Sequence, residues 1–330
     1  MNQTLQEIVT GAQKLLIIQA ENPDGDSLGS ALALEQIFGA MGKDAYMYCP
    51  VDMPKHLRYF TGWDRVTQEF PNQFDASFIV DTSSLSLLEK ALANGSRAKL
   101  TKKPIVFIDH HNTDSEIDFE HLMLCDPQKV ATAEIIYDLA KQHTWPIDSE
   151  SGRSIVAAIM SDSLGLVSEK TTSDTVHAVA EIMQQHAVSL SEIDVARRSY
   201  GKKSREILTY KGKLLQRITF ELDGRLALLS IPEPEIKQYS DAYNPSVLAL
   251  EDLRSVEGVE LSIILKVYNN RITGKLRSND GAKICDKIAE KFGGGGHPYA
   301  AGFRTSDWSQ DDLRIELIKV TRTLLEDEAV

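Results

Sequence analysis

The sequence predicts an α/β fold: a mainly parallel sheet with helices on both faces, followed by a smaller α+β domain. The first observation is that short apolar runs alternate with helical stretches. The apolar runs are at residues 15–18, 44–49, 74–80, 105–108 and 120–125, and the helical stretches are at 28–41, 85–93, 132–142 and 172–186. This alternation is typical of parallel sheets whose strands are joined by helices. The second observation is that the alternation stops after residue 216. At 330 residues the chain is long enough for two domains.

We expect the first domain to span residues 1–187 and the second to span residues 217–330. A polar stretch at 188–216 separates them and is expected to be a linker with some helix. In the second domain, strand-like runs at 217–231, 259–267 and 271–277 occur with the hairpin-type turns Asp223-Gly224, within the first run, and Asn269-Asn270, between the other two. Helical patterns at 282–291 and 310–326 follow these runs.

Composition narrows the function classes. The chain is 42% hydrophobic and 25% charged, as in ordinary soluble proteins. Its net charge of −12 argues against binding to a long nucleic-acid duplex, which needs clustered Lys and Arg. The three cysteines form no CxxC pair, so we expect reduced thiols rather than disulfides or a zinc knuckle. The first residues lack a basic segment and a long apolar run, and no apolar run nears the length of a membrane span. We therefore expect a cytoplasmic protein without a membrane partner.

Several acidic and imidazole side chains follow apolar runs. Asp24-Gly25-Asp26 follows the first run, Asp81 follows the third, and Asp109-His110-His111 follows residues 105–108. Parallel strands place their carboxyl ends at one edge of the sheet, where ligands bind. Asp162 follows the apolar residues 155–160, whose pattern does not separate helix from strand. Each group alone could be a solvated turn or a helix cap.

Together, these groups predict a metal site, because so many carboxylates would repel one another without a cation. Mixed carboxylate and imidazole ligands favour Mn²⁺, with Mg²⁺, Co²⁺ or Fe²⁺ as alternatives. Two such ions about 3.5–4 Å apart would activate a water and neutralise a phosphoryl oxygen. Asp81, central in the chain order, is our candidate for a carboxylate that bridges both ions.

A glycine run near the C-terminus predicts an anion site. Gly293-Gly294-Gly295-Gly296 precedes His297 and an apolar segment. Consecutive glycines let backbone N–H groups approach an anion closely. Arg277-Ser278-Asn279 ends an earlier strand-like run and adds a forked cation suited to phosphate or carboxylate.

These segments together resemble the DHH family of phosphoesterases in its form with DHH and DHHA1 domains, and within it the bacterial oligoribonuclease and pAp phosphatase group. The segments that carry the resemblance occur in the family's order: residues 22–30, 80–82, Asp109-His110-His111, Ser161-Asp162, Arg277-Ser278-Asn279 and 293–297. The resemblance covers nearly the whole chain.

The resemblance implies a metal-dependent hydrolase of phosphoester bonds, with a cleft between the DHH domain (1–187) and the DHHA1 domain (217–330). It implies that Mn²⁺ is bound by the side chains of Asp24, Asp26, Asp81, His110 and Asp162. His111 would act near the reacting phosphate. The substrate would be bound by Arg277, Ser278, Asn279, Gly295, Gly296 and His297. The substrate would be a short RNA or DNA oligonucleotide, a dinucleotide or pAp, and a homodimer remains an open alternative to a monomer.

One residue departs from the family pattern. The family usually has a His four residues before the first Asp of the DxD pair, and Ala20 stands there. The first metal site therefore lacks one imidazole, and one ion could bind instead of two. A nucleotide-binding protein without turnover is the main alternative to an active enzyme. A cyclic dinucleotide or polyphosphate hydrolase is the other.

Overall fold

The computed structural model describes residues 4–111, 117–240, 243–279 and 281–327. The chain divides into two compact units, Met1–Lys202 and Lys203–Val330. The stretch that we expected to be a linker, 188–216, contains one helix of each unit, Leu190–Tyr200 and Arg205–Leu215, so the boundary lies between these two helices.

Unit 1 is built on a five-stranded sheet in the order β2-β1-β3-β4-β5, in which every pairing is parallel. The predicted fold class is confirmed. The strands are β1 (Lys14–Ile18), β2 (Asp44–Tyr48), β3 (Ala76–Val80), β4 (Ile105–Asp109) and β5 (Leu122–Cys125). β3 and β4 are buried along their whole length, which explains why they are largely apolar, with Ser77 and Asp109 as their polar residues.

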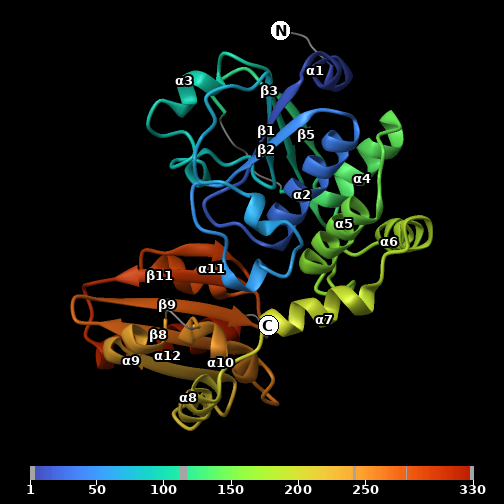
Figure 1. Ribbon diagram of the computed structural model, residues 1–330. Coiled ribbons are helices and arrows are strands. Elements are labelled where there is room, and N and C mark those ends of the chain that lie inside the picture. The colour runs from blue at the N-terminus through green and yellow to red at the C-terminus, as the bar shows by residue number, and fades with distance from the viewer. Residues whose placement is uncertain (1–3, 112–116, 241–242, 280, 328–330) are drawn as a thin grey trace. The chain divides into compact units, whose positions relative to one another are not determined.

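Helices cover both faces of this sheet. α2 (Gly25–Ala40), α4 (Thr132–His143) and α5 (Ser149–Asp162) lie on one side, and α3 (Ser96–Leu100) lies on the other (Figure 1). The remaining helices of unit 1 are α1 (Leu5–Gly11), α6 (Ser173–His186) and α7 (Leu190–Tyr200), with short 3-10 turns at Lys55–Leu57, Trp63–Arg65 and Leu85–Leu87. Separate apolar clusters fill the two faces, one with Leu15 and Ile17 and the other with Leu16 and Ile18. This alternation along β1 is that of a strand buried on both faces.

Two sequence-based expectations for unit 1 were wrong. α2 begins at Gly25, with Asp24 as its N-cap, and not at the expected residue 28. The predicted helix at 85–93 is a 3-10 turn followed by turns. The pattern at residues 155–160 left helix and strand open, and these residues lie within helix α5, so Asp162 is at the C-terminus of a helix.

Unit 2 has a six-stranded mixed sheet in the order β10-β11-β9-β8-β7-β6. Only β7 and β8 run parallel among its pairings. The strands are β6 (Thr219–Glu221), β7 (Leu226–Pro232), β8 (Leu261–Tyr268), β9 (Arg271–Ser278), β10 (Gly295–His297) and β11 (Ala300–Thr305). The helices are α8 (Arg205–Leu215), α9 (Glu233–Tyr239), α10 (Pro245–Arg254), α11 (Cys285–Lys291) and α12 (Gln310–Asp327). The sequence patterns missed α9 and α10.

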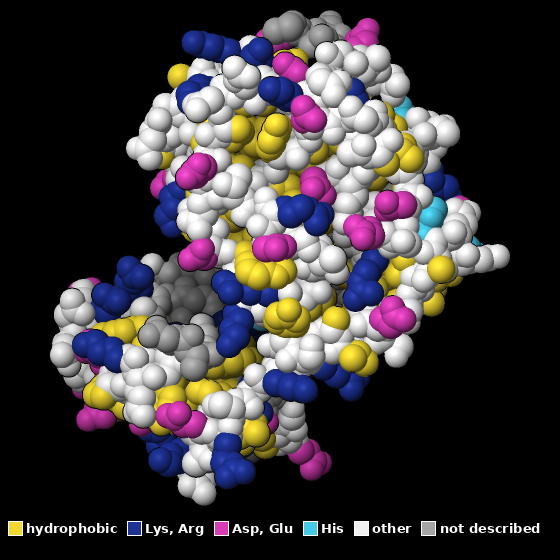
Figure 2. Space-filling model, viewed as in Figure 1, with side chains coloured by type: hydrophobic (Ala, Val, Ile, Leu, Met, Phe, Trp, Pro, Cys, Tyr) yellow, Lys and Arg dark blue, Asp and Glu magenta, His cyan; other side chains and the backbone are white. Residues whose placement is uncertain are grey.

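The described side chains give two surface findings. No helix among them is long and apolar enough to cross a membrane. On the face drawn in Figure 2, acidic and basic side chains are interspersed, and its described residues show no continuous Lys and Arg tract.

Candidate metal centre

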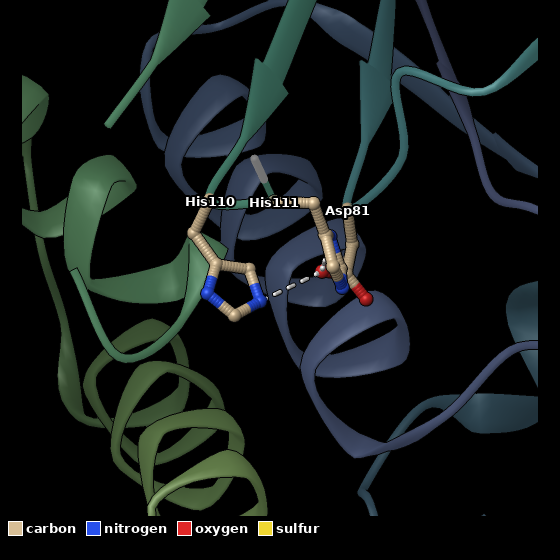
Figure 3. A group of neighbouring side chains, drawn as sticks. All are labelled: Asp81, His110 and His111. Carbon is tan, nitrogen blue, oxygen red and sulfur yellow. Dashed lines mark ion pairs between the residues drawn. The ribbon is translucent and has the colours of Figure 1, made fainter. Parts of the chain in front are cut away.

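Four of the residues predicted as metal ligands meet in unit 1. Nε2 of His110 lies 3.4 Å from Oδ2 of Asp162, 3.6 Å from Oδ1 of Asp81 and 3.8 Å from Oδ2 of Asp26. Asp26, His110 and Asp162 form one group of possible metal ligands, and Asp81, His110 and His111 form a second (Figure 3). The two groups share His110, which faces the carboxylates from the end of β4.

Close packing of two helices brings Asp26 and Asp162 together. A Cβ added to Gly25 would lie 2.2 Å from Oγ of Ser161, and one added to Gly29 would lie 2.7 Å from Cβ of Ala158. Only residues without a side chain allow α2 and α5 to approach so closely. The glycine between the two aspartates therefore serves helix packing, whereas on sequence alone this segment could be a solvated turn.

The N-terminus of α4 orients two of the carboxylates. Its N-cap residue, Ala131, has no side chain that can cap the helix. The carboxylate of Asp26 accepts the N–H groups of Thr132 at 2.6 Å and Ala133 at 3.1 Å instead. The hydroxyl of Thr132 donates to Oδ1 of Asp81 at 3.1 Å. A helix N-terminus is a natural partner for a carboxylate, so this end of α4 fixes both ligand candidates.

A backbone carbonyl sets the state of His110. Nδ1 of His110 lies 3.3 Å from the carbonyl oxygen of Lys129. That contact requires a proton on Nδ1 and leaves the lone pair of neutral imidazole on Nε2. Within the described residues, Nε2 is buried and has no hydrogen-bond partner. A buried nitrogen lone pair that faces three carboxylates is suited to a metal cation.

A buried glutamate supports the loop that carries this carbonyl. Glu134 of α4 is 1% exposed and accepts hydrogen bonds from Nζ of Lys129, the N–H of Val130 and the hydroxyl of Thr175, at 3.1, 3.2 and 3.1 Å. Lys129 also pairs with Asp138 at 2.6 Å. The sequence reading gave Glu134 no role, because a glutamate in a helix normally faces solvent.

Asp109 orients the second imidazole. It is fully buried, and its Oδ1 accepts both the N–H of His111 at 3.1 Å and its Nδ1 at 2.8 Å. Burial alone would raise the pKa of Asp109, but the contacts with His111 and Ser83 outweigh it and the pKa falls below its usual value. His111 keeps half of its side chain exposed. The sequence reading identified Asp109 within the motif but did not assign it this positioning role.

The electrostatics of the group also indicate a missing positive charge. Burial raises the pKa of Asp26 to about 6, and the charge of Asp162 adds to that rise. Burial also raises the pKa of Asp81 well above its usual range, with further contributions from Asp26 and Asp24. Burial by itself lowers the pKa of His110, but Asp162 and Asp26 raise it more. Crowded buried carboxylates of this kind gain from a cation. The donor set and its charge therefore fit a divalent metal.

Asp81 and Asp162 occupy positions that are unfavourable without a ligand. Asp81 has a φ of +61°, in the left-handed region that few non-glycine residues adopt. Asp162 ends α5, where the helix dipole disfavours a negative side chain. Strained backbone angles and unfavourably placed charges are common at functional sites.

Asp24 and Ala20 lie differently from the other predicted residues. Oδ1 of Asp24 caps α2 by accepting the N–H groups of Asp26 and Ser27, both at 3.0 Å. Asp24 belongs to neither group of possible ligands. Ala20 is buried, and its neighbour Glu21 pairs with Lys90 at 3.2 Å. Glu21 therefore does not replace the imidazole that is missing at position 20.

The predicted substrate residues lie in unit 2. Ser278 is buried at the end of β9, and Nη1 of Arg277 donates to the Leu276 carbonyl at 2.8 Å. The amide of Asn279 donates to the carbonyls of Arg254 and Val259, at 2.8 and 2.6 Å. Asn279 therefore also has a structural role, holding the end of α10 against the start of β8.

The glycine run forms the edge strand β10. A Cβ at Gly296 would lie 2.6 Å from the carbonyl oxygen of Ala300, and one at Gly294 would lie 2.1 Å from that of Gly302. These two glycines therefore permit close pairing with β11. Gly295 and His297 are exposed, and a Cβ at Gly295 would meet nothing within 4 Å. They leave room for a ligand.

The class of protein follows from this fold and this group of side chains. Residues 14–162 match the model of the DHH family, N-terminal domain. The chain therefore contains a DHH-family domain, and the resemblance noted in the sequence is confirmed there.

Particular relatives match over most of the chain. The bifunctional oligoribonuclease and PAP phosphatase NrnA of Thermus thermophilus is 28% identical over 91% of this chain and 87% of its own length. The protein of that name from Bacillus subtilis is 22% identical over 88% of each. The cyclic-di-AMP phosphodiesterase PdeA of Listeria monocytogenes is 22% identical over 96% of this chain, which spans only 49% of that longer protein. These relatives are named as hydrolases of phosphoester bonds.

Solved structures share the fold. An exopolyphosphatase-related protein from Bacteroides fragilis has a TM-score of 0.83 at 22% identity, covering 97% of this chain and 96% of that one. RecJ from Thermus thermophilus in complex with Mn²⁺ has a TM-score of 0.53 at 15% identity, covering 97% of this chain and 53% of that one. At these identities the likeness concerns the fold alone.

Proposed function

We propose that the chain is a divalent-metal-dependent phosphoesterase that hydrolyses short oligonucleotides, dinucleotides or pAp. The observation that carries the proposal is the buried Nε2 of His110, which faces Asp26, Asp81 and Asp162 at 3.4–3.8 Å. Mixed imidazole and carboxylate donors suit Mn²⁺, with Mg²⁺ or Co²⁺ as substitutes. The names of the relatives that match over most of the chain support the same class of substrate.

Each residue of the centre has a distinct task in this proposal. A bound divalent ion would supply a Lewis acid that activates water and neutralises charge on a phosphoryl oxygen. Asp26, Asp81, His110 and Asp162 would hold it, with Asp24 completing the first site. Asp81 belongs to the second group and lies 3.6 Å from Nε2 of His110, and we assign to its carboxylate the bridge between two ions. His111, held by Asp109 and half exposed, would place its imidazole near the reacting phosphate.

In unit 2, we assign substrate binding to Arg277, Ser278, Asn279, Gly295, Gly296 and His297. The guanidinium of Arg277 and the exposed His297 supply donors for phosphate oxygens. The three free cysteines fit a cytoplasmic location.

Turnover with defined substrates tests the function. Wild-type protein with Mn²⁺ should hydrolyse a 5′-phosphorylated RNA dinucleotide or pAp, and lose activity in EDTA. Asp81→Ala should lose more bound Mn²⁺ and more activity than Asp162→Ala, since it would remove a ligand shared by both ions. Full Mn²⁺ stoichiometry in Asp81→Ala would contradict the bridging role. No turnover of any of these substrates at saturation would contradict the function.

Ala20 favours one alternative, a nucleotide-binding protein without turnover. This alternative predicts tight nucleotide binding with low metal occupancy. If Ala20→His creates activity where the wild type has none, the alternative holds. If the wild type already turns over and Ala20→His changes only Mn²⁺ affinity, the alternative fails.

A substrate panel separates the remaining candidates. The match to a cyclic-di-AMP phosphodiesterase over 96% of this chain makes cyclic dinucleotides the next substrate class to measure, and polyphosphate completes the panel. Measured kcat/KM values rank linear dinucleotide, pAp, cyclic-di-AMP and polyphosphate as substrates. If kcat/KM is higher for a cyclic dinucleotide than for linear dinucleotide and pAp, the cyclic substrate replaces our assignment.

A further inference from the structure

One face of the unit 2 sheet carries a row of basic side chains. Alternate residues of β8 and β9, including Leu261, Ile263 and Leu276, point into the apolar core on the other face. Lys266 on β8, with Lys275 and Arg277 on β9, therefore share the opposite face. In the pairing of the two strands, Arg277 lies opposite Ser262 and Lys275 lies opposite Ile264.

These three cations are half-buried, and no described carboxylate forms an ion pair with them. Among the residues that the structure describes, Lys266, Lys275 and Arg277 form no ion pair with a carboxylate. Lys266 donates to Oδ1 of Asn244 at 2.9 Å, a neutral partner. Nearby Glu251 already pairs with Arg254, at 3.6 Å.

The pKa shifts show the cost of this arrangement. Burial lowers the pKa of Lys275, and the charges of Arg277 and Lys266 lower it further. Burial lowers the pKa of Lys266 as well. Like charges that are partly removed from water and lack a counter-charge are destabilising unless an anion binds.

The neighbouring strand carries only small side chains on this face. Ala300 of β11 pairs with Arg277, and Gly302 pairs with Lys275. Since Ala301 and Phe303 point into the core, Ala300 and Gly302 face the same side as the cations. On the β8 side this face is covered, because Ile264 packs against α10, so a ligand next to Lys275 would lie on the β11 side.

We propose that Lys275 and Lys266 extend the Arg277 site into a subsite for the internucleotide phosphates of an oligonucleotide of three or more nucleotides. This inference rests on the proposed function, because it assumes a nucleotide near Arg277. Lys275 and Arg277 are two residues apart on one strand, so their Cα atoms are separated by roughly 7 Å. That separation allows each cation to contact a different phosphate of an extended single strand. Mononucleotides such as pAp would reach Arg277 and leave Lys275 free.

Binding of RNA of different lengths tests the subsite in the full-length protein. Fluorescence anisotropy in EDTA, where metal-dependent cleavage is absent, gives Kd for a labelled pentanucleotide, and competition gives Kd for pAp. Lys275→Met keeps much of the side-chain stem and removes the charge. We expect it to weaken pentanucleotide binding about 5–10-fold and to reduce the slope of log Kd against log salt by about one. Binding of pAp should change less than about twofold. Lys275→Met combined with Lys266→Met should weaken the pentanucleotide further.

Lys319→Met is the matched control, because Lys319 is exposed on α12 and pairs with Glu316 at 3.4 Å. Any of three results would overturn the subsite. Lys275→Met could weaken pentanucleotide and pAp binding equally, it could weaken pentanucleotide binding no more than Lys319→Met does, or the wild type could bind pentanucleotide no better than pAp.

Turnover assays distinguish the subsite from the proposed function. If the wild type shows the expected length dependence in binding but hydrolyses nothing, the proposed function fails and the subsite stands. If dinucleotide is hydrolysed and Lys275→Met binds pentanucleotide normally, the subsite fails alone.

Discussion

The buried Glu134 offers a sharp test of how the metal centre is supported. Glu134→Ala would remove the acceptor for Lys129, Val130 and Thr175. Lys129 would keep Asp138 as its partner, whereas the N–H of Val130 and the hydroxyl of Thr175 would lose theirs. Each unpaired buried group costs about 1–3 kcal/mol. With two such groups left unpaired, we expect the free energy of unfolding to fall by about 2–6 kcal/mol.

We expect Glu134→Ala to weaken metal binding as well. The loop that Glu134 supports carries the Lys129 carbonyl, which sets the tautomer of His110, and leads into the α4 N-terminus that binds Asp26. Loss of groups that orient metal ligands typically weakens metal affinity about 10–100-fold. Isothermal titration with Mn²⁺ measures this effect, and urea unfolding followed by Trp fluorescence measures the stability. A Trp308→Phe background leaves Trp63 and Trp145, both in unit 1.

Asp138→Asn provides the control, because Asp138 contacts the same lysine from a half-exposed position and should cost at most about 1 kcal/mol. If Glu134→Ala unfolds at the same urea concentration as this control, the buried hydrogen bonds do not matter as argued. If it is destabilised but binds Mn²⁺ as tightly as the wild type, Glu134 stabilises unit 1 without positioning the ligands.

Three further predictions follow from the same structure. Gly29→Ala should lower stability by about 1–3 kcal/mol in a thermal melt, because its methyl group would overlap α5, whereas Gly39→Ala in the same helix meets nothing within 4 Å and should be neutral or slightly stabilising. In chelated, metal-free protein, the pKa of Asp26, raised to about 6, makes the folded state bind a proton more tightly than the unfolded chain. The free energy of unfolding should then rise as pH falls below 6, by up to about 3 kcal/mol, and be lost as pH rises through 6. Urea unfolding at a series of pH values measures this change, and saturating Mn²⁺ should abolish it. Asp109→Asn should lower kcat more than it raises KM, because His111 loses its orienting carboxylate while the metal ligands remain, and a variant with normal kcat would contradict that role.

The sequence alone could predict the parallel sheet and most of the residues at its edge. Fully buried parallel strands are mainly apolar, so β3 and β4 stood out as apolar runs with polar residues at their ends. That geometry predicted the placement of Asp81 and Asp109. It left the element before Asp162 open, because an apolar run at the end of a buried helix has the same local pattern as a strand.

The start of α2 shows the same limit of local reasoning. The sequence pattern placed the helix from residue 28 and left Asp24-Gly25-Asp26 as a possible turn, since Gly and Asp are common in turns. In the structure Gly25 is the first residue of the helix, because α5 packs against it. Packing against a segment far away in the chain cannot be predicted from the local sequence pattern.

The sequence by itself determined the fold class, the chemistry of the ligands and the absence of an imidazole at Ala20, because these depend on residue types and their order along the chain. Tertiary structure decided which carboxylates meet His110, which helix N-terminus holds Asp26, and that Glu134 is buried. It also placed Lys266 and Lys275 side by side on one face of a sheet without an acidic partner among the described residues. These features depend on distances between segments far apart in the chain, and such distances exist only once the helices have packed on the sheet.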